Sequence, residues 1–202
     1  MEPAPPSPSV TATGEDAFGP GVVRPGSDGL VPCGRKERSI AGAVEVTTTT
    51  TCYRVTGSTI DEINAQIEKK GPKVNGRDAV AATRWAIRWG YTSVADGDLC
   101  RASKIQVSET LSYEYPNLVA PDADAATSAE WERFMTDEVI PHEERHGTIA
   151  TDGADELLRI LRRIPDAADC DALRVDIDGA AKRVVRQTRA SQDAFDRREQ
   201  HT

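Results

Sequence analysis

The chain has 202 residues, of which 38% are hydrophobic and 29% are charged, and its formal net charge is −8. This composition is typical of a soluble globular domain, and the acidic balance argues against a nucleic-acid partner, because such binding requires a basic surface. No apolar run approaches the roughly 18 residues that a membrane-spanning helix needs, so we predict no integral membrane segment.

The N-terminal part of the chain differs in composition from the rest. Residues 1–38 are rich in Pro, Gly and Ser. They contain too little apolar material to offset the entropy lost on ordering, so we predict a flexible tail. Residues 39–202 have the pattern of one globular domain. The first residues lack the basic and then apolar pattern of a signal peptide.

The domain begins with a predicted strand and helix. The β-branched run at 43–55 predicts a strand. In the helix that follows, Thr59 and Glu62 fit a capping box, and Gly71 marks the end.

Two segments with alternating apolar and polar residues come next, at 83–91 and 103–116. This alternation is typical of half-buried strands. The Asp96-Gly97 turn region between them predicts an antiparallel hairpin with a long loop.

Residues 127–140 predict a helix, in which Thr127 and Glu130 fit a second capping box. Pro141 follows directly, and we expect it to kink the helix or to restart it with proline at the first helical position.

Two further helices are predicted at 153–164 and 171–195, separated by Pro165. One stripe of the last helix is formed by Leu173, Ile177, Ala181, Val184, Thr188 and Phe195. Strands followed by helices indicate an α+β fold, in which a small antiparallel sheet packs against a helical hairpin.

The segment HEERH, residues 142–146, contains two of the three histidines of the chain. On a helix His142 and His146 project from one face, close enough to bind one zinc ion. Glu143 would flank that ion, where it can take a proton from a zinc-activated water and later donate it to the leaving amine. The spacing therefore predicts a zinc peptidase site. The alternative is an exposed charged helix that matches the motif by chance.

Catalytic zinc needs a third protein ligand. Asp152 lies ten residues after His142, where metzincins carry theirs, but Ile149 stands in place of the glycine that turns the chain in those proteins. His201 is the other candidate. If the helices on either side of Pro165 pack antiparallel, the C-terminal residues can return to the metal.

The order of these segments resembles a bacterial family of uncharacterised domains described as predicted secreted zinc-dependent proteases. The resemblance covers residues 45–202 and rests on the order of CYRVTGSTIDEINAQIEKKGP, ATRWAIRWGY, KIQVSETLSYEYP, WERFMTDEVIPHEERHG and QDAFDRREQHT. It implies a zincin-like fold, a zinc cofactor and a peptide or protein substrate.

Carried over by position, the resemblance makes His142 and His146 zinc ligands and Glu143 the catalytic acid and base. Asp196 and His201 match the Asp and His of the family's C-terminal element. The resemblance therefore favours His201 as the third ligand, with Asp196 as an alternative.

The chain departs from the family pattern in that C-terminal element. Phe195 replaces a tyrosine, Glu199 a threonine and Thr202 a glycine. These changes imply weakened activity, so the alternative function is an inactive metal-binding scaffold of the same fold.

The resemblance also implies an extracytoplasmic location, with a cytoplasmic one as the alternative. An oxidising compartment favours disulfides among the four cysteines. We expect the pair Cys100–Cys170 first and Cys33–Cys52 second.

Overall fold

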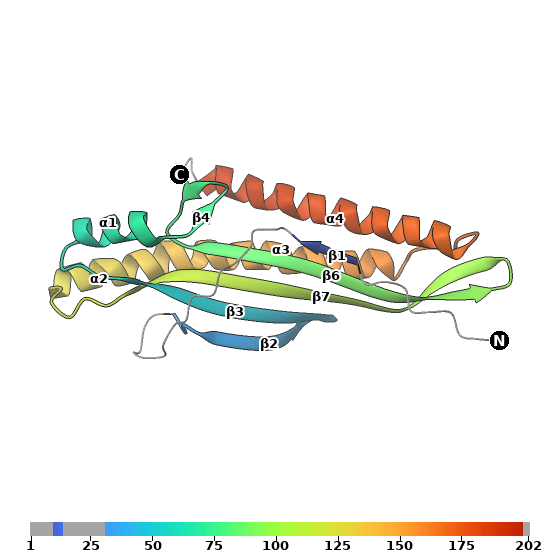
Figure 1. Ribbon diagram of the computed structural model, residues 1–202, viewed down its shortest axis with the longest axis horizontal. Coiled ribbons are helices and arrows are strands. Elements are labelled where there is room, and N and C mark those ends of the chain that lie inside the picture. The colour runs from blue at the N-terminus through green and yellow to red at the C-terminus, as the bar shows by residue number, and fades with distance from the viewer. Residues whose placement is uncertain (1–9, 14–30, 200–202) are drawn as a thin grey trace.

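The computed structural model describes residues 10–13 and 31–199 of the chain (Figure 1). Its strands are β1 (Val10–Thr13), β2 (Arg35–Ala41), β3 (Val44–Val55), β4 (Lys73–Val74), β5 (Arg77–Asp78), β6 (Ala82–Asp96) and β7 (Leu99–Leu118). Its helices are α1 (Ile60–Lys70), α2 (Ala125–Arg133), the π-helical turn η1 (Phe134–Val139), α3 (Ile140–Leu161) and α4 (Cys170–Glu199). The predicted α+β class is confirmed, because α3 and α4 pack together against one face of a five-stranded sheet.

The sheet is mixed, and not antiparallel as the sequence predicted. Its strand order is β1-β6-β7-β3-β2, in which β3 runs parallel to β7 and the other pairs are antiparallel. The parallel pair arises because the chain passes from β3 through α1 and the β4–β5 hairpin into β6, and β7 then returns between β6 and β3. Parallel neighbours need such a crossover connection, which local alternation does not reveal.

The predicted hairpin of β6 and β7 is confirmed, but its loop is short. Only Gly97 and Asp98 separate the two strands, and Gly97 has a φ of 63°. The strands extend beyond their alternating segments, with one register shift between Gly90 and Thr92. Their outer ends are held by backbone pairing and bury little, so apolar alternation stops before the strands do.

Most of the segment predicted as a tail, residues 1–38, lies outside the described residues. Two described parts of it belong to strands. Residues 10–13 form β1, which pairs antiparallel with residues 86–89 of β6. Strand β2 begins at Arg35 and pairs along β3.

The main core lies between the sheet and the two long helices. The sheet contributes Val44, Val46, Ile87, Trp89, Val107 and Leu111, and the helices contribute Ala150, Ala154, Leu157, Leu158, Leu161, Leu173, Ile177, Ala181 and Val184. The predicted stripe on α4 is buried as expected, from Leu173 to Phe195. A second cluster joins α1, α2 and η1 to the ends of β3 and β7.

Helix α1 begins as predicted at Thr59, whose side chain accepts a hydrogen bond from the Glu62 N–H at 3.3 Å. The other half of the predicted capping box differs, because the Glu62 carboxylate accepts a hydrogen bond from the Ser58 N–H at 2.8 Å. The second predicted cap is wrong. Asp124 caps α2 and accepts a hydrogen bond from the Thr127 N–H at 2.7 Å. Asp is as good a capping residue as Thr, and it stands three positions earlier.

The polypeptide stays helical from Ala125 to Leu161, so Pro141 does not break the helix. The Ile140 N–H bonds to the Met135 carbonyl, which is the wider i to i−5 spacing of a π-helix. In a regular α-helix the proline ring would clash with the carbonyl four residues earlier. The π-helical turn therefore replaces the predicted kink or restart, and Pro141 lies in the first turn of α3.

Helices α3 and α4 pack antiparallel and closely. A Cβ added to Gly153 of α3 would lie 2.2 Å from Thr188 Oγ1 of α4, so the contact requires glycine. Both predicted disulfides are present. Cys100–Cys170 ties the start of β7 to the start of α4, and Cys33–Cys52 ties the chain before β2 to β3. Across the described ranges, no helix is both long and apolar enough to span a membrane.

Candidate metal centre

The HEERH segment lies in the first two turns of α3, and its histidines face α4. The rings of His142 and His146 have centroids 4.8 Å apart and Nε2 atoms 3.2 Å apart. Both side chains remain partly exposed, whereas Glu143 is only 6% exposed. The helical spacing therefore brings the two imidazoles together, as predicted.

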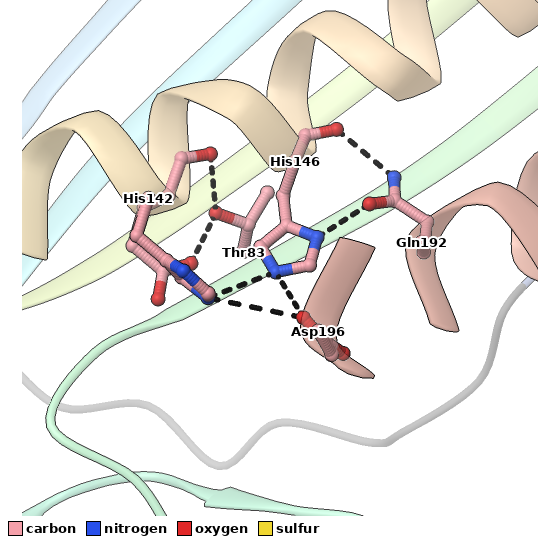
Figure 2. Close-up of polar contacts among 6 residues, drawn as sticks. Thr83, His142, His146, Gln192 and Asp196 are labelled. Atoms are coloured by element: carbon pink, nitrogen blue, oxygen red, sulfur yellow. Dashed lines mark hydrogen bonds and ion pairs between the residues drawn. The ribbon is translucent and has the colours of Figure 1, made fainter. Parts of the chain in front are cut away.

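Helix α4 supplies a third group. Asp196 Oδ1 lies 2.8 Å from His146 Nε2 and 3.8 Å from His142 Nε2. Figure 2 shows the three side chains pointing toward one another. Within residues 10–13 and 31–199, no other set of three or more His, Cys, Asp or Glu side chains brings its ligand atoms this close. Asp196, and not a group on α3, stands at the third position.

The separations of these three atoms fit a tetrahedral ion. Ligand atoms about 2.0–2.1 Å from a tetrahedral zinc ion lie about 3.3 Å from one another. The observed separations of 3.2, 2.8 and 3.8 Å scatter around that value. A point about 2 Å from all three atoms exists, so the site needs little rearrangement to hold zinc.

Gln192 lies one helical turn before Asp196 and holds His146 from the other side (Figure 2). Its Nε2 donates a hydrogen bond to the backbone carbonyl of His146 at 2.9 Å, and its Oε1 is in short contact with His146 Nδ1. Because the carbonyl can only accept, the amide orientation is fixed. Gln192 Oε1 must then accept a proton from His146 Nδ1.

This hydrogen bond determines what His146 presents to Asp196. A neutral imidazole with its proton on Nδ1 has only a lone pair on Nε2. That lone pair faces a carboxylate oxygen at 2.8 Å, which is a contact between two acceptors. A metal ion bound at Nε2 would stabilise this contact. The donor set is therefore suited to a cation.

Glu143 is oriented by a strand of the sheet. Thr83 of β6 donates a hydrogen bond to Glu143 Oε2 at 2.6 Å, and the same hydroxyl lies 3.1 Å from the Glu143 carbonyl oxygen. Burial raises the pKa of Glu143, and the Thr83 hydrogen bond and the neighbouring histidines oppose that rise. The carboxyl group is therefore held near the imidazoles, where it can accept and donate a proton.

Phe195 covers the two histidines. Its ring centroid lies 4.9 Å from that of His142 and 5.0 Å from that of His146. The contacts restrict both rings but offer no hydroxyl. The position matches the tyrosine that the family resemblance implies, so any hydrogen bond from such a tyrosine is lost in this chain.

The centre opens into a large cleft of about 1410 Å³. Its walls come from the β4–β5 hairpin, the start of β6, η1, the start of α3 and the end of α4. In Figure 1 the end of α4 lies beside that hairpin. The lining includes apolar side chains such as Val80, Trp85 and Phe134, together with charges of both signs. A ligand much larger than a water molecule can therefore reach His142 and Glu143.

The other candidate ligands have different outcomes. Asp152 is exposed and lies on the unbroken part of α3, about 15 Å along the axis from His142. It cannot ligate there, because Ile149 allows the helix to continue where metzincins turn. His201 lies outside the described residues and stays a prediction.

Two residues of the centre were not predicted from the sequence. Gln192 precedes Asp196 by four residues on α4, so the two side chains lie on the same face of the helix. Helical spacing therefore pointed to Gln192 once Asp196 was a candidate. Thr83 gave none, because its contact with Glu143 joins residues 60 positions apart.

The model of a family described as "Bacterial protein of unknown function (DUF922)" matches residues 50–202. The chain belongs to the DUF922 family. The matched range contains all six residues of the centre, which are Thr83, His142, Glu143, His146, Gln192 and Asp196. No curated protein and no solved structure matches this DUF922 chain.

Proposed function

We propose that this DUF922 protein is a zinc-dependent peptidase. One observation carries the proposal: His142 Nε2, His146 Nε2 and Asp196 Oδ1 converge beside the buried carboxyl group of Glu143, at the wall of an open cleft. Two imidazoles and one carboxylate form a ligand set found in catalytic zinc sites, which keep a further position open.

The chain's own residues would divide the chemistry. His142, His146 and Asp196 would hold zinc, which supplies a Lewis acid and lowers the pKa of water toward about 7. Glu143 would accept a proton on its carboxylate from the attacking water and deliver it to the leaving amine. Thr83 would keep that carboxyl group turned toward the histidines, because its hydroxyl already donates to Oε2.

The cleft suggests how a peptide would lie. The pairing of β6 with β1 starts at Ala86, and the residues of β6 before it line the cleft, with Thr83 bonded to Glu143. A peptide in extended conformation would add to this part of β6 and form backbone hydrogen bonds. The scissile bond of that peptide would then lie near Thr83 and Glu143.

The disulfides support an extracytoplasmic location for this activity. Cys33–Cys52 and Cys100–Cys170 account for all four cysteines. Structural disulfides persist mainly in oxidising compartments. This placement agrees with the secreted character that the family resemblance implies.

Phe195 favours a second candidate function. Its ring lies against both histidines, where the resemblance implies a tyrosine, and it has no hydroxyl to stabilise a transition state. The protein would then bind zinc as a scaffold and hydrolyse nothing.

One experiment tests the proposal and separates the two candidates. The protein is purified without a polyhistidine tag, and its zinc content and cleavage of a broad peptide library are measured. The peptidase proposal predicts close to one zinc per chain and cleavage that Glu143→Gln abolishes without loss of zinc. One zinc without cleavage would support the scaffold, and no zinc would contradict both.

A further inference from the structure

We infer that Gln192 is a positioning residue that fixes the tautomer of His146, so that Nε2 and not Nδ1 receives the metal ion. This inference rests on the proposed zinc site. It assigns a role to a residue outside the proposed set of metal ligands, and it predicts a proton position that can be observed before any metal is added.

The first step is the burial of Gln192. The residue is 8% exposed, although glutamine is usually found at the surface. Both atoms of its amide are used, Nε2 on the His146 carbonyl and Oε1 on His146 Nδ1. A buried amide is stable only when its hydrogen bonds are formed, so these contacts hold the side chain in one orientation.

The second step is the effect on the ring. The amide oxygen accepts the Nδ1 proton, which leaves the lone pair of neutral His146 on Nε2. Nε2 is the atom that lies 3.2 Å from His142 Nε2 and 2.8 Å from Asp196 Oδ1. Gln192 therefore directs the metal-binding atom of His146 to the point where the other two ligand atoms meet.

The third step concerns charge. Metal-bound histidines often donate their second N–H to a carboxylate, which adds a negative charge near the ion. Here Glu143 and Asp196 already provide two carboxyl groups around the pair of imidazoles. A neutral amide gives the same orientation as a carboxylate and adds no further repulsion to a cluster that is already acidic.

The fourth step is the link between helices. Gln192 and Asp196 stand on α4, while both histidines stand on α3. The two hydrogen bonds between Gln192 and His146 join α4 to α3 one helical turn before Asp196. The side chain that orients His146 therefore stands on the same helix as the third ligand.

The test measures the tautomer and the zinc affinity separately. Nitrogen-15 NMR of the metal-free protein, at a pH where the rings are neutral, reports which nitrogen of His146 is protonated. Competition with a chelator reports the affinity for zinc. The variants are Gln192→Met, which removes the hydrogen bonds at similar size, and Gln192→Glu, which keeps the acceptor. Gln187→Met, an exposed position on the same helix, is the control.

We expect His146 to carry its proton on Nδ1 in the wild-type protein and in Gln192→Glu. Gln192→Met should lose this preference and bind zinc about 10- to 100-fold more weakly, and Gln187→Met should match the wild type. An Nε2 proton in wild-type His146 would overturn the inference, whether or not Gln192→Met folds. An unchanged tautomer and affinity in a folded Gln192→Met would also overturn it. If the wild type binds no zinc, the proposed function fails, and the tautomer of the metal-free protein still decides the role of Gln192.

Discussion

Two buried glutamates, Glu143 of α3 and Glu109 of β7, each accept a hydrogen bond from a threonine, but their surroundings differ. Glu143 accepts a hydrogen bond from Thr83, and Glu109 of β7 accepts one from Thr151 of α3 at 2.8 Å. Each threonine hydroxyl also lies 3.1 Å from a backbone carbonyl of α3. Glu143 lines the open cleft beside two histidines, whereas Glu109 is 2% exposed inside the core.

Burial alone does not make a carboxyl group functional. Burial raises the pKa of both residues, and that of Glu109 reaches about 7. A raised pKa is therefore no guide by itself to the active group. Glu109 has the acidic residues Asp152 and Asp155 nearby, and its Oε1 has no hydrogen-bond partner among the described residues. Of the two, only Glu143 lies at the wall of a cleft that His142, His146 and Asp196 also line.

The largest expected effect is on turnover. Glu143→Gln should lower peptide cleavage by about 10²- to 10⁴-fold, because the amide cannot accept the proton of the attacking water. Its zinc content should stay at the wild-type value. Glu109→Gln is the matched control and should leave kcat and zinc content unchanged. Equal loss of cleavage in both variants would mean that the two sites do not differ as proposed.

The disulfides at the two ends of the domain should contribute different amounts to the free energy of unfolding. Cys100–Cys170 spans 70 residues far from the centre, and Cys33–Cys52 spans 19 residues beside the cluster that includes Trp131. Replacing each pair by serine should lower the free energy of unfolding by about 4 and about 3 kcal/mol, because the longer loop restricts the unfolded chain more. Denaturant titrations measure both values. A larger loss for the shorter loop would contradict this ranking.

Glu109 should make stability depend on pH. Between about pH 4.5 and 7 the folded protein keeps a proton on Glu109 that the unfolded chain has released. Folding stability therefore falls as the pH rises through this window, by on the order of 2–3 kcal/mol. Glu109→Gln should remove this fall and match the wild type near pH 4.5. If the free energy of unfolding falls equally with pH in the wild type and in Glu109→Gln, Glu109 is not the cause of the fall.

The smallest expected effects come from the two threonines. Thr83→Val should reduce kcat by roughly tenfold with little change in KM, because a lost hydrogen bond of about 1–2 kcal/mol frees the Glu143 carboxyl group. Thr151→Val should lower the free energy of unfolding by a similar amount and leave kcat unchanged. Thr83→Ser should restore the wild-type rate. A fall in kcat for Thr151→Val would remove the distinction between the two pairs.

Local sequence signals predicted those parts of the fold that depend on local contacts. The cap at Thr59, the buried stripe of α4 and the two imidazoles of HEERH follow from residues within a few positions of one another. The parallel pairing of β3 with β7 could not be predicted, because it joins Glu45 to Ser108 across a crossover.

The site shows the same division. His142, Glu143 and His146 lie on one helix, and their spacing alone brings them together. Asp196 and Gln192 reach them across the interface of α3 and α4, where Gly153 lets the helices approach closely at Thr188. The sequence therefore offered several candidates for the third ligand, and the packing of the two helices brings Asp196 close to both histidines.

The most direct test of the proposed metal centre is a zinc-edge anomalous difference map from crystals of the tag-free protein soaked in zinc. We expect a peak about 2.0–2.2 Å from His142 Nε2, His146 Nε2 and Asp196 Oδ1. The map would also show whether His201 joins them. No peak at this position, or zinc bound only elsewhere, would contradict the proposed metal centre.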